Sequence, residues 1–313
     1  MLEVDPKTTP VPQVHQYLLG GVAPRPIALV STLSADGIRN LTPFSFFNAF
    51  GANPPTIAFS PARRGRDGTF KDTYNNLMAT KECTVQAVTQ SIMHQVNLAS
   101  AEWAPEIDEF VKSGLTPVES VKVKPPRVRE SPFQMECVLK QMIPLGDGRA
   151  AGNLAICEVV LFHIDERLLE GNIIIPGRIE HVARNGGDWW SRVTAENAFH
   201  LPKPKEGLLI GFDNLPEYVR RSHVLSANNL GQLANFESMP TVDEARQFMT
   251  TVDTTMNSEA LRLLKYALQS GGSGANEWVM FENAARTALD LADDRRAAWH
   301  ILVYGHSLIP GDR

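Results

Sequence analysis

Cysteines are few in this sequence of 313 residues, and they form no recognisable pairs. Cys83, Cys137 and Cys157 are widely spaced and include no CxxC. An odd number of scattered thiols does not suit a disulfide framework. We therefore expect buried free thiols in a reducing, cytoplasmic environment.

Long hydrophobic runs are missing as well. No window of the sequence approaches about 18 uninterrupted apolar residues, the length that a membrane helix needs. The start, Met1 to Asp5, lacks the basic and then apolar profile of a secretory signal. We expect neither a membrane span nor export, and we predict a cytoplasmic protein.

Excess basic charge and several familiar motifs are also absent. The formal net charge is −5, and no run of Lys or Arg occurs, so the sequence predicts no binding to nucleic acid or anionic lipid. The eight histidines show no HxxxH or Cys/His spacing, which argues against a metal site. Neither GxSxG nor GxGxxG occurs, so a serine hydrolase and a Rossmann nicotinamide domain lack support.

Short β-type segments dominate the first half of the chain, and 43% of all residues are hydrophobic, enough for a sizeable core. Few helical patterns interrupt them, at 70–80 and 91–101, while 105–132 is typical of an irregular connection. This arrangement favours a barrel over a doubly wound sheet. The predicted strands span 27–33, 38–48, 55–60, 83–88, 134–143 and 154–164.

The segment 24–48 contains an unusual mixture of polar and aromatic residues. Asp36-Gly37 predicts a tight turn between two strands. After it, Thr42, Ser45 and Asn48 recur every third residue among prolines and phenylalanines, which is not the alternation of a half-buried strand. Polar groups beside large apolar faces suit a flat ring with polar edges, such as isoalloxazine.

A series of short motifs resembles the flavin reductase-like family, the group with an FMN-binding split barrel that includes the flavoredoxins. Their joint order is specific, and they cover roughly the first two hundred residues. Two departures stand out: Trp189-Trp190 replaces a usual tyrosine, and the chain continues well beyond Pro204. The motifs are Pro24-Arg25-Pro26, 28–32, 40–48, Pro54-Pro55, Phe59-Ser60, Lys71-Asp72-Thr73 with Asn76, Glu109-Phe110, 114–116, 124–128, 130–132 and Glu136-Cys137.

The resemblance implies a mainly β (α+β) fold, a Greek-key split β-barrel with peripheral helices over residues 1–205. It also implies a homodimer with FMN at the subunit interface. Residues 206–313 are expected to form a mostly helical extension. The segment 200–206, with two prolines and several charges, is the boundary expected from composition.

Lys71-Asp72-Thr73 opens the predicted helix at 70–80. Backbone N–H groups, a hydroxyl and an ammonium there would suit a phosphate, although Asp72 or Thr73 could also be an ordinary N-cap. The resemblance favours the phosphate of FMN. The arginines just upstream, at 63, 64 and 66, either add positive electrostatic potential at this phosphate or lie in a solvated loop.

The remaining site predictions concern the flavin ring and its open face. By resemblance, Thr42, Pro43, Phe44 and Ser45 contact the isoalloxazine edge, and Arg25, Asn48 and Ser60 are further cofactor contacts. A second group either lines the face where a substrate stacks or forms a surface loop with aromatic anchors: His181, Arg184, Trp189 and Trp190. His163 is interpreted as a satisfied histidine in the core or at the end of a strand.

Beyond residue 206 the pattern becomes helical. Thr241-Val242-Asp243-Glu244 predicts a capping box, and Ala245, Phe248, Met249, Val252 and Met256 follow at helical spacing. Further helices are expected from Ser258 and over 277–292, separated by a linker at 271–274. We expect these apolar stripes to pack on the barrel or on a dimer mate.

These observations favour an FMN-dependent oxidoreductase that transfers hydride from C4 of NAD(P)H, a transient co-substrate, to flavin N5 and passes electrons on. No catalytic acid or base is identified. Two other classes remain open: an FMN enzyme acting on an aromatic or heterocyclic compound, and a non-catalytic flavin-binding protein that docks a partner.

Overall fold

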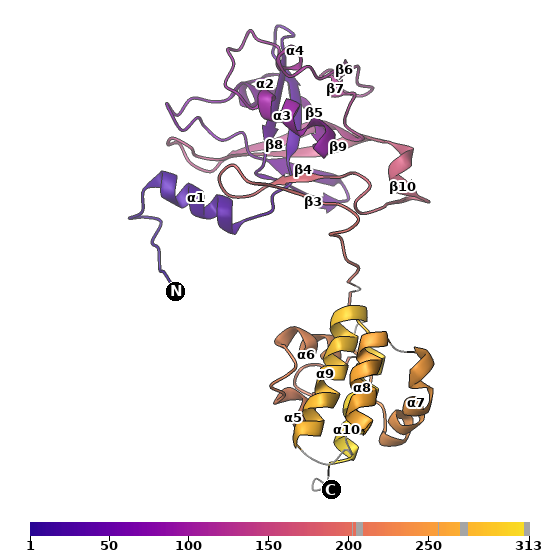
Figure 1. Ribbon diagram of the computed structural model, residues 1–313. Coiled ribbons are helices and arrows are strands. Elements are labelled where there is room, and N and C mark those ends of the chain that lie inside the picture. The colour runs from indigo at the N-terminus through magenta and orange to yellow at the C-terminus, as the bar shows by residue number, and fades with distance from the viewer. Residues whose placement is uncertain (202, 205–208, 256, 270–274, 310–313) are drawn as a thin grey trace. The chain divides into compact units, whose positions relative to one another are not determined.

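The computed structural model describes residues 1–201, 203–204, 209–255, 257–269 and 275–309. The chain divides into two compact units, Met1–His200 and Leu201–Arg313 (Figure 1). Among the described residues, the first unit contains every strand and four α-helices, and the elements of the second unit are α-helices. In the described part of the chain, no helix is both long and apolar enough to cross a bilayer.

A seven-stranded antiparallel sheet forms the centre of the first unit, with the strand order β2-β1-β5-β8-β9-β4-β3. Its interior contains the three cysteines, which are buried and free, as expected. The strands are β1 (Ala28–Leu33), β2 (Arg39–Phe44), β3 (Phe47–Ala52), β4 (Pro55–Phe59), β5 (Glu82–Ala87), β8 (Phe133–Pro144) and β9 (Asn153–Ile164).

The predicted strand over 38–48 is in fact two strands, so this part of the prediction is wrong. β2 ends at Phe44 and β3 begins at Phe47, and these two strands are the opposite edges of the sheet. Seven flat strands would place the edges about 29 Å apart, whereas three residues span at most about 11 Å. The sheet must therefore curl until its edges approach, and the chain bends sharply at Ser45 to pass between them.

Small elements surround this sheet. The predicted helices correspond to α2 (Asp72–Thr80) and α3 (Met93–Ala99), whereas the sequence pattern did not reveal α1 (Val11–Gly21), which has no buried residue. The expected irregular segment 105–132 contains α4 (Glu109–Ser113) and a short hairpin. The other small elements are β6 (Pro117–Val118), β7 (Arg127–Val128), β10 (Leu169–Glu170), β11 (Ile173–Ile174), β12 (Val182–Arg184), β13 (Trp190–Arg192), η1 (Gln90–Ile92) and η2 (Glu166–Leu168).

Six helices make up the described part of the second unit. The capping box is confirmed: Thr241 Oγ1 accepts from the Glu244 N–H, and the Glu244 carboxylate accepts from the Thr241 N–H at 2.7 Å. The helices are α5 (Glu217–Arg220), α6 (Ala227–Ala234), α7 (Val242–Thr255), α8 (Ser258–Gln269), α9 (Ala275–Ala292) and α10 (Arg295–Ser307).

The apolar stripes of these helices face one another, which corrects the expectation that they cover the barrel or a dimer mate. Ala245, Val252, Leu264 and Trp299 all belong to one core cluster whose members come from the helical unit alone. Amphipathic spacing indicates that a face is buried but not what buries it. The predicted linker at 271–274, Met256 and the proposed boundary at 205/206 lie outside the described residues.

Candidate flavin site

The free edge of β2 presents main-chain groups away from the sheet. The Leu41 N–H donates to the Glu109 carboxylate at 3.1 Å, so the main-chain groups of Leu41 point away from β1. Main-chain groups of residues two apart face the same way in a strand. The carbonyl of Pro43 and the main-chain groups near Ser45 therefore continue this outer edge, and Pro43 leaves no N–H unpaired there.

A buried polar network fixes this edge to α2 and α4. Thr73 Oγ1 donates to Asn40 Oδ1 at 2.8 Å, and Asn40 Nδ2 donates to Glu109 at 2.9 Å. Asn76 extends the network by donating to Thr32 Oγ1 at 3.0 Å. Burial raises the pKa of Glu109, while hydrogen bonds from Leu41 and Asn40 act in the opposite direction. The network holds the start of α2 beside β2.

This network changes the role predicted for Thr73. The residue is only 1% exposed and its hydroxyl already donates to Asn40. Its side chain therefore acts as a structural link between α2 and β2, and only its backbone N–H remains available at the helix start. Long-range partners of this kind leave no local signal in the sequence.

The start of α2 carries a lysine that has no direct ion pair. Lys71 is half-buried at the N-cap, and its ammonium lies 5.8 Å from the centre of the Phe44 ring. Within the described residues its ammonium makes no ion pair or hydrogen bond, although the carboxylates of Glu102 and Asp72 act on it electrostatically. Burial is the largest effect and lowers the pKa of Lys71; Glu102 and Asp72 raise this pKa, and Arg64 lowers it. Asp72, by contrast, pairs with Arg64 at 3.0 Å and is not free to repel an anion.

A cavity of about 210 Å³ adjoins the outer end of β2. It brings Pro43 and Ser45, predicted to contact the ring, together with Arg184 and Trp190, predicted at the open face. The Arg184 guanidinium lies 4.9 Å from the centre of the Trp190 ring and donates to the Gly187 carbonyl. The full lining is Ile27, Pro43, Ser45, Asn97, Ser100, Arg184 and Trp190.

The two other residues predicted at the open face lie elsewhere. Trp189 is 77% exposed, and His181 is exposed where the chain enters β12. Neither lines this cavity. Of the four residues, the structure therefore brings only Arg184 and Trp190 to the β2 edge.

Arg25 has a structural role in this part of the molecule. It is buried, and its guanidinium donates to the carbonyls of Leu19, Val22 and Asn185. These bonds tie the end of α1 to the loop that follows Arg184. Arg25 thus positions the Arg184 wall of the cavity. Its Nε is buried without a hydrogen-bond partner, and its contact with a flavin stays a prediction.

Asn48 and Ser60 lie in a second, mostly apolar cavity of about 430 Å³ between α1 and the β3–β4 edge. Phe46 and Phe47 also line this cavity; Phe46 is exposed, whereas Phe47 packs against the core of the barrel as well. Ser60 Oγ accepts from the Asn153 N–H at 3.2 Å. The predicted cofactor residues are thus divided between two cavities.

Asn40 and Glu109 are the site residues whose roles the sequence did not reveal. Both occur within the motifs that carry the resemblance, but only the fold brings Glu109 against the β2 edge. His163 behaves as expected: it bonds the buried Glu136 at 2.6 Å, and three backbone N–H groups from residues 121–123 also donate to that carboxylate.

A curled antiparallel sheet whose two edge strands approach each other defines a split-barrel protein. The chain matches the family described as "Flavin reductase like domain" over residues 20–181, and it belongs to that family. Membership indicates a flavin cofactor and a flavin reductase type of function. The helical unit lies beyond the matched range.

Several relatives agree with this assignment. An "Uncharacterized protein" of Aquifex aeolicus (strain VF5) is 35% identical over 191 residues, which is 61% of this chain and 95% of the relative. Nitrilotriacetate monooxygenase component B from Bacillus cereus is 33% identical, with a TM-score of 0.61, covering 64% of this chain and 98% of that one. Pseudomonas fluorescens 2-nitrobenzoate 2-nitroreductase NbaA is 25% identical, with a TM-score of 0.55, covering 66% and 100%.

Proposed function

We propose that the first unit binds FMN and reduces it with NAD(P)H, and that the reduced flavin passes electrons to a further acceptor. The observation that carries this proposal is the half-buried Lys71 ammonium at the start of α2, which makes no ion pair or hydrogen bond with a described residue. A phosphate there would receive the ammonium, the free N–H groups of the first helical turn and the positive end of the helix dipole.

The ring of FMN would lie along the outer edge of β2. Pro43 and Ser45 line the cavity there, and Phe44 lies next to Lys71, so ring and phosphate contacts come from adjoining elements. Donors and acceptors at a flavin's edge tune its electronics. Glu109 holds the strand in place, and Arg25 holds the Arg184 wall.

Two copies of the chain would complete this site, with FMN at their interface. The cavity beside β2, at about 210 Å³, is below the roughly 300–1,000 Å³ of typical ligand pockets. A second chain would supply the missing wall. Exposed apolar side chains on α1 and β3, including Val11, Leu18 and Phe50, offer a surface for it.

Bound FMN would supply the redox chemistry by accepting hydride from the nicotinamide. The chain's own residues bind and orient the two molecules. Lys71 holds the phosphate, and the β2 edge fixes the flavin ring. Trp190, with the Arg184 guanidinium over its ring, offers a surface for the nicotinamide next to the open face of the flavin. The proposal requires no proton transfer by a side chain.

Steady-state oxidation of NADH or NADPH with added FMN tests the function directly. The purified protein is expected to oxidise one of them at a rate that increases with FMN and saturates. Free FMN without protein, at the same concentration, is the control. A rate no higher than this control would contradict a reductase and favour a flavin-binding protein that docks a partner.

A second function is favoured by the apolar cavity between α1 and the β3–β4 edge and by the likeness to a 2-nitrobenzoate 2-nitroreductase. In this alternative the protein retains FMN and reduces an aromatic compound. Nicotinamide oxidation that depends on added 2-nitrobenzoate, and not on exchange of free FMN, would support it. Equal rates with and without the nitro compound would contradict it.

Ser45→Ala is expected to change the bound flavin while leaving the fold intact. One hydrogen bond contributes about 0.5–1.5 kcal/mol, which corresponds to a shift of about 10–30 mV in the two-electron potential. Absorbance spectra and a redox titration measure the effect. Ser34→Ala, in the turn at the other end of the β1–β2 hairpin, is the matched control. An unchanged potential in Ser45→Ala would place Ser45 outside the ring contacts.

A further inference from the structure

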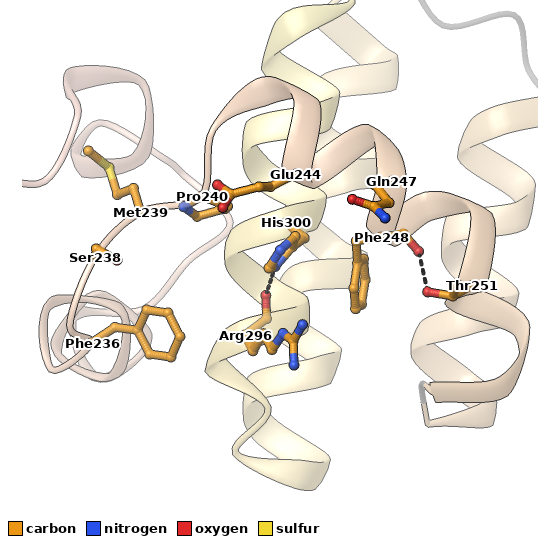
Figure 2. Close-up of a pocket in the computed structure, with 10 residues that line it drawn as sticks. All are labelled: Phe236, Ser238, Met239, Pro240, Glu244, Gln247, Phe248, Thr251, Arg296 and His300. Carbon is orange, nitrogen blue, oxygen red and sulfur yellow. Dashed lines mark hydrogen bonds between the residues drawn. The ribbon is translucent and has the colours of Figure 1, made fainter.

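The helical unit has a cavity of its own, of about 520 Å³, which lies outside the range matched by the family. Figure 2 shows that its residues come from α7, from α10 and from the loop 236–240 before α7. The volume is within the range of small-molecule pockets. Its walls combine apolar side chains, including Phe236, Met239 and Phe248, with polar groups at the centre.

One of these polar groups is an arginine without a partner. Arg296 lies at the start of α10, and within the described residues its guanidinium makes no ion pair or hydrogen bond. Neighbouring Arg295, by contrast, pairs with Asp293 at 2.7 Å. Arg296 also lines an adjoining cavity. Phe236 and Arg296 are common to the linings of both cavities.

The second polar group is a buried histidine. His300 is only 8% exposed, and its Nδ1 lies 2.7 Å from the Arg296 carbonyl oxygen. A carbonyl only accepts, so Nδ1 carries a proton and Nε2 is left for other partners. No described residue bonds Nε2, and the ring packs against Phe248 at 4.5 Å between centres. His300 lines the open cavity, so its unpaired ring nitrogen is available to a polar atom of a ligand there.

The charge of the cavity favours an anion. Its formally charged side chains are Glu244 and Arg296. The Glu244 carboxylate is already compensated: Thr241 donates to it from both its N–H and its hydroxyl, at 2.7 and 2.8 Å, and it lies in the first turn of α7. Arg296 has no such compensation, and a planar guanidinium suits a carboxylate.

We propose that this cavity binds a small amphiphilic carboxylate, with its anionic group on Arg296 and its apolar body between Phe236 and Phe248. A polar atom of the same ligand reaches His300 Nε2. The site does not depend on FMN binding in the first unit, and it gives the helical unit a role as a ligand-binding module.

The test is calorimetric titration of the full-length protein with three compounds that share one ring: indole-3-acetate, indole-3-acetamide and tryptamine. Indole-3-acetate is expected to bind with a Kd on the order of 1 mM, as suits its size. The affinity for the neutral amide is expected to be lower by about tenfold or more, and the cationic amine is expected not to bind. Equal affinity for all three would overturn the proposal.

Variants locate the site. Arg296→Gln should weaken indole-3-acetate binding by about tenfold or more and remove the preference over the amide, while thermal unfolding stays unchanged because the side chain is exposed and unpaired. Arg262→Gln, an exposed arginine of α8 that lines neither cavity, is the matched control. Undetectable binding of indole-3-acetate, or binding that Arg296→Gln does not change, would refute a carboxylate site here.

Discussion

Replacing Lys71 by alanine is expected to weaken FMN binding by about 10- to 100-fold and to leave riboflavin binding almost unchanged. A charge-assisted hydrogen bond contributes about 1.5–3 kcal/mol, and only FMN has the phosphate that would receive it. Burial lowers the pKa of Lys71, and a phosphate beside the ammonium would raise it again. Fluorescence titration of flavin with the wild-type and variant proteins measures both affinities.

Two further substitutions make this result specific. Lys140→Ala removes an exposed lysine that pairs with Glu158 at 2.9 Å, and it should change neither affinity. Thr73→Val removes the buried bond to Asn40 and should lower the free energy of unfolding by about 1–3 kcal/mol, whereas Thr73→Ser should retain it. Equal losses of FMN and riboflavin affinity in Lys71→Ala would remove Lys71 from the phosphate site.

Features that depend on neighbouring residues could be predicted from the sequence. The turn at Asp36-Gly37 is present, with Gly37 at φ +83°, a conformation that glycine adopts without strain. The capping box at Thr241 starts α7, because its partner is three residues away. The same holds for α2 and α3, whose boundaries differ from the predicted ones by a few residues.

Features that depend on distant partners could not be predicted. Arg25 donates to the carbonyl of Asn185, which is 160 residues away, so its structural role has no local signal. Thr73 bonds Asn40 across 33 residues. The break between β2 and β3 follows from the closing of the sheet, which no local pattern encodes. The positions of Lys71 and Ser45 are compatible with the predicted contacts to the phosphate and to the flavin ring, which stay predictions.

The helical unit shows the same limit for packing. The spacing of Ala245, Phe248 and Val252 correctly indicated a buried face, and this face packs on α10 within the core of the helical unit. A core built entirely from residues of one unit predicts that this unit unfolds separately. Trp299 provides the means to test this, because it is fully buried in that core.

Trp299→Ala is expected to unfold the helical unit selectively. The indole is 0% exposed, and its Nε1 donates to the Leu233 carbonyl at 3.1 Å. Truncating a buried tryptophan costs about 3–5 kcal/mol, a large part of the roughly 5–15 kcal/mol that stabilises a domain. For a unit of this size the transition should fall by more than about 10 °C. Calorimetric unfolding should then show two separate transitions.

Flavin binding provides the second readout of this variant. Because the β2 edge, Lys71 and the cavity beside them belong to the first unit, FMN affinity and the upper transition should stay at their wild-type values. Trp189→Ala makes the same chemical change at a side chain that is 77% exposed, and it should alter stability by less than about 0.5 kcal/mol. A single transition that moves as a whole in Trp299→Ala would mean that the units unfold together, since destabilising one core would then destabilise the entire chain.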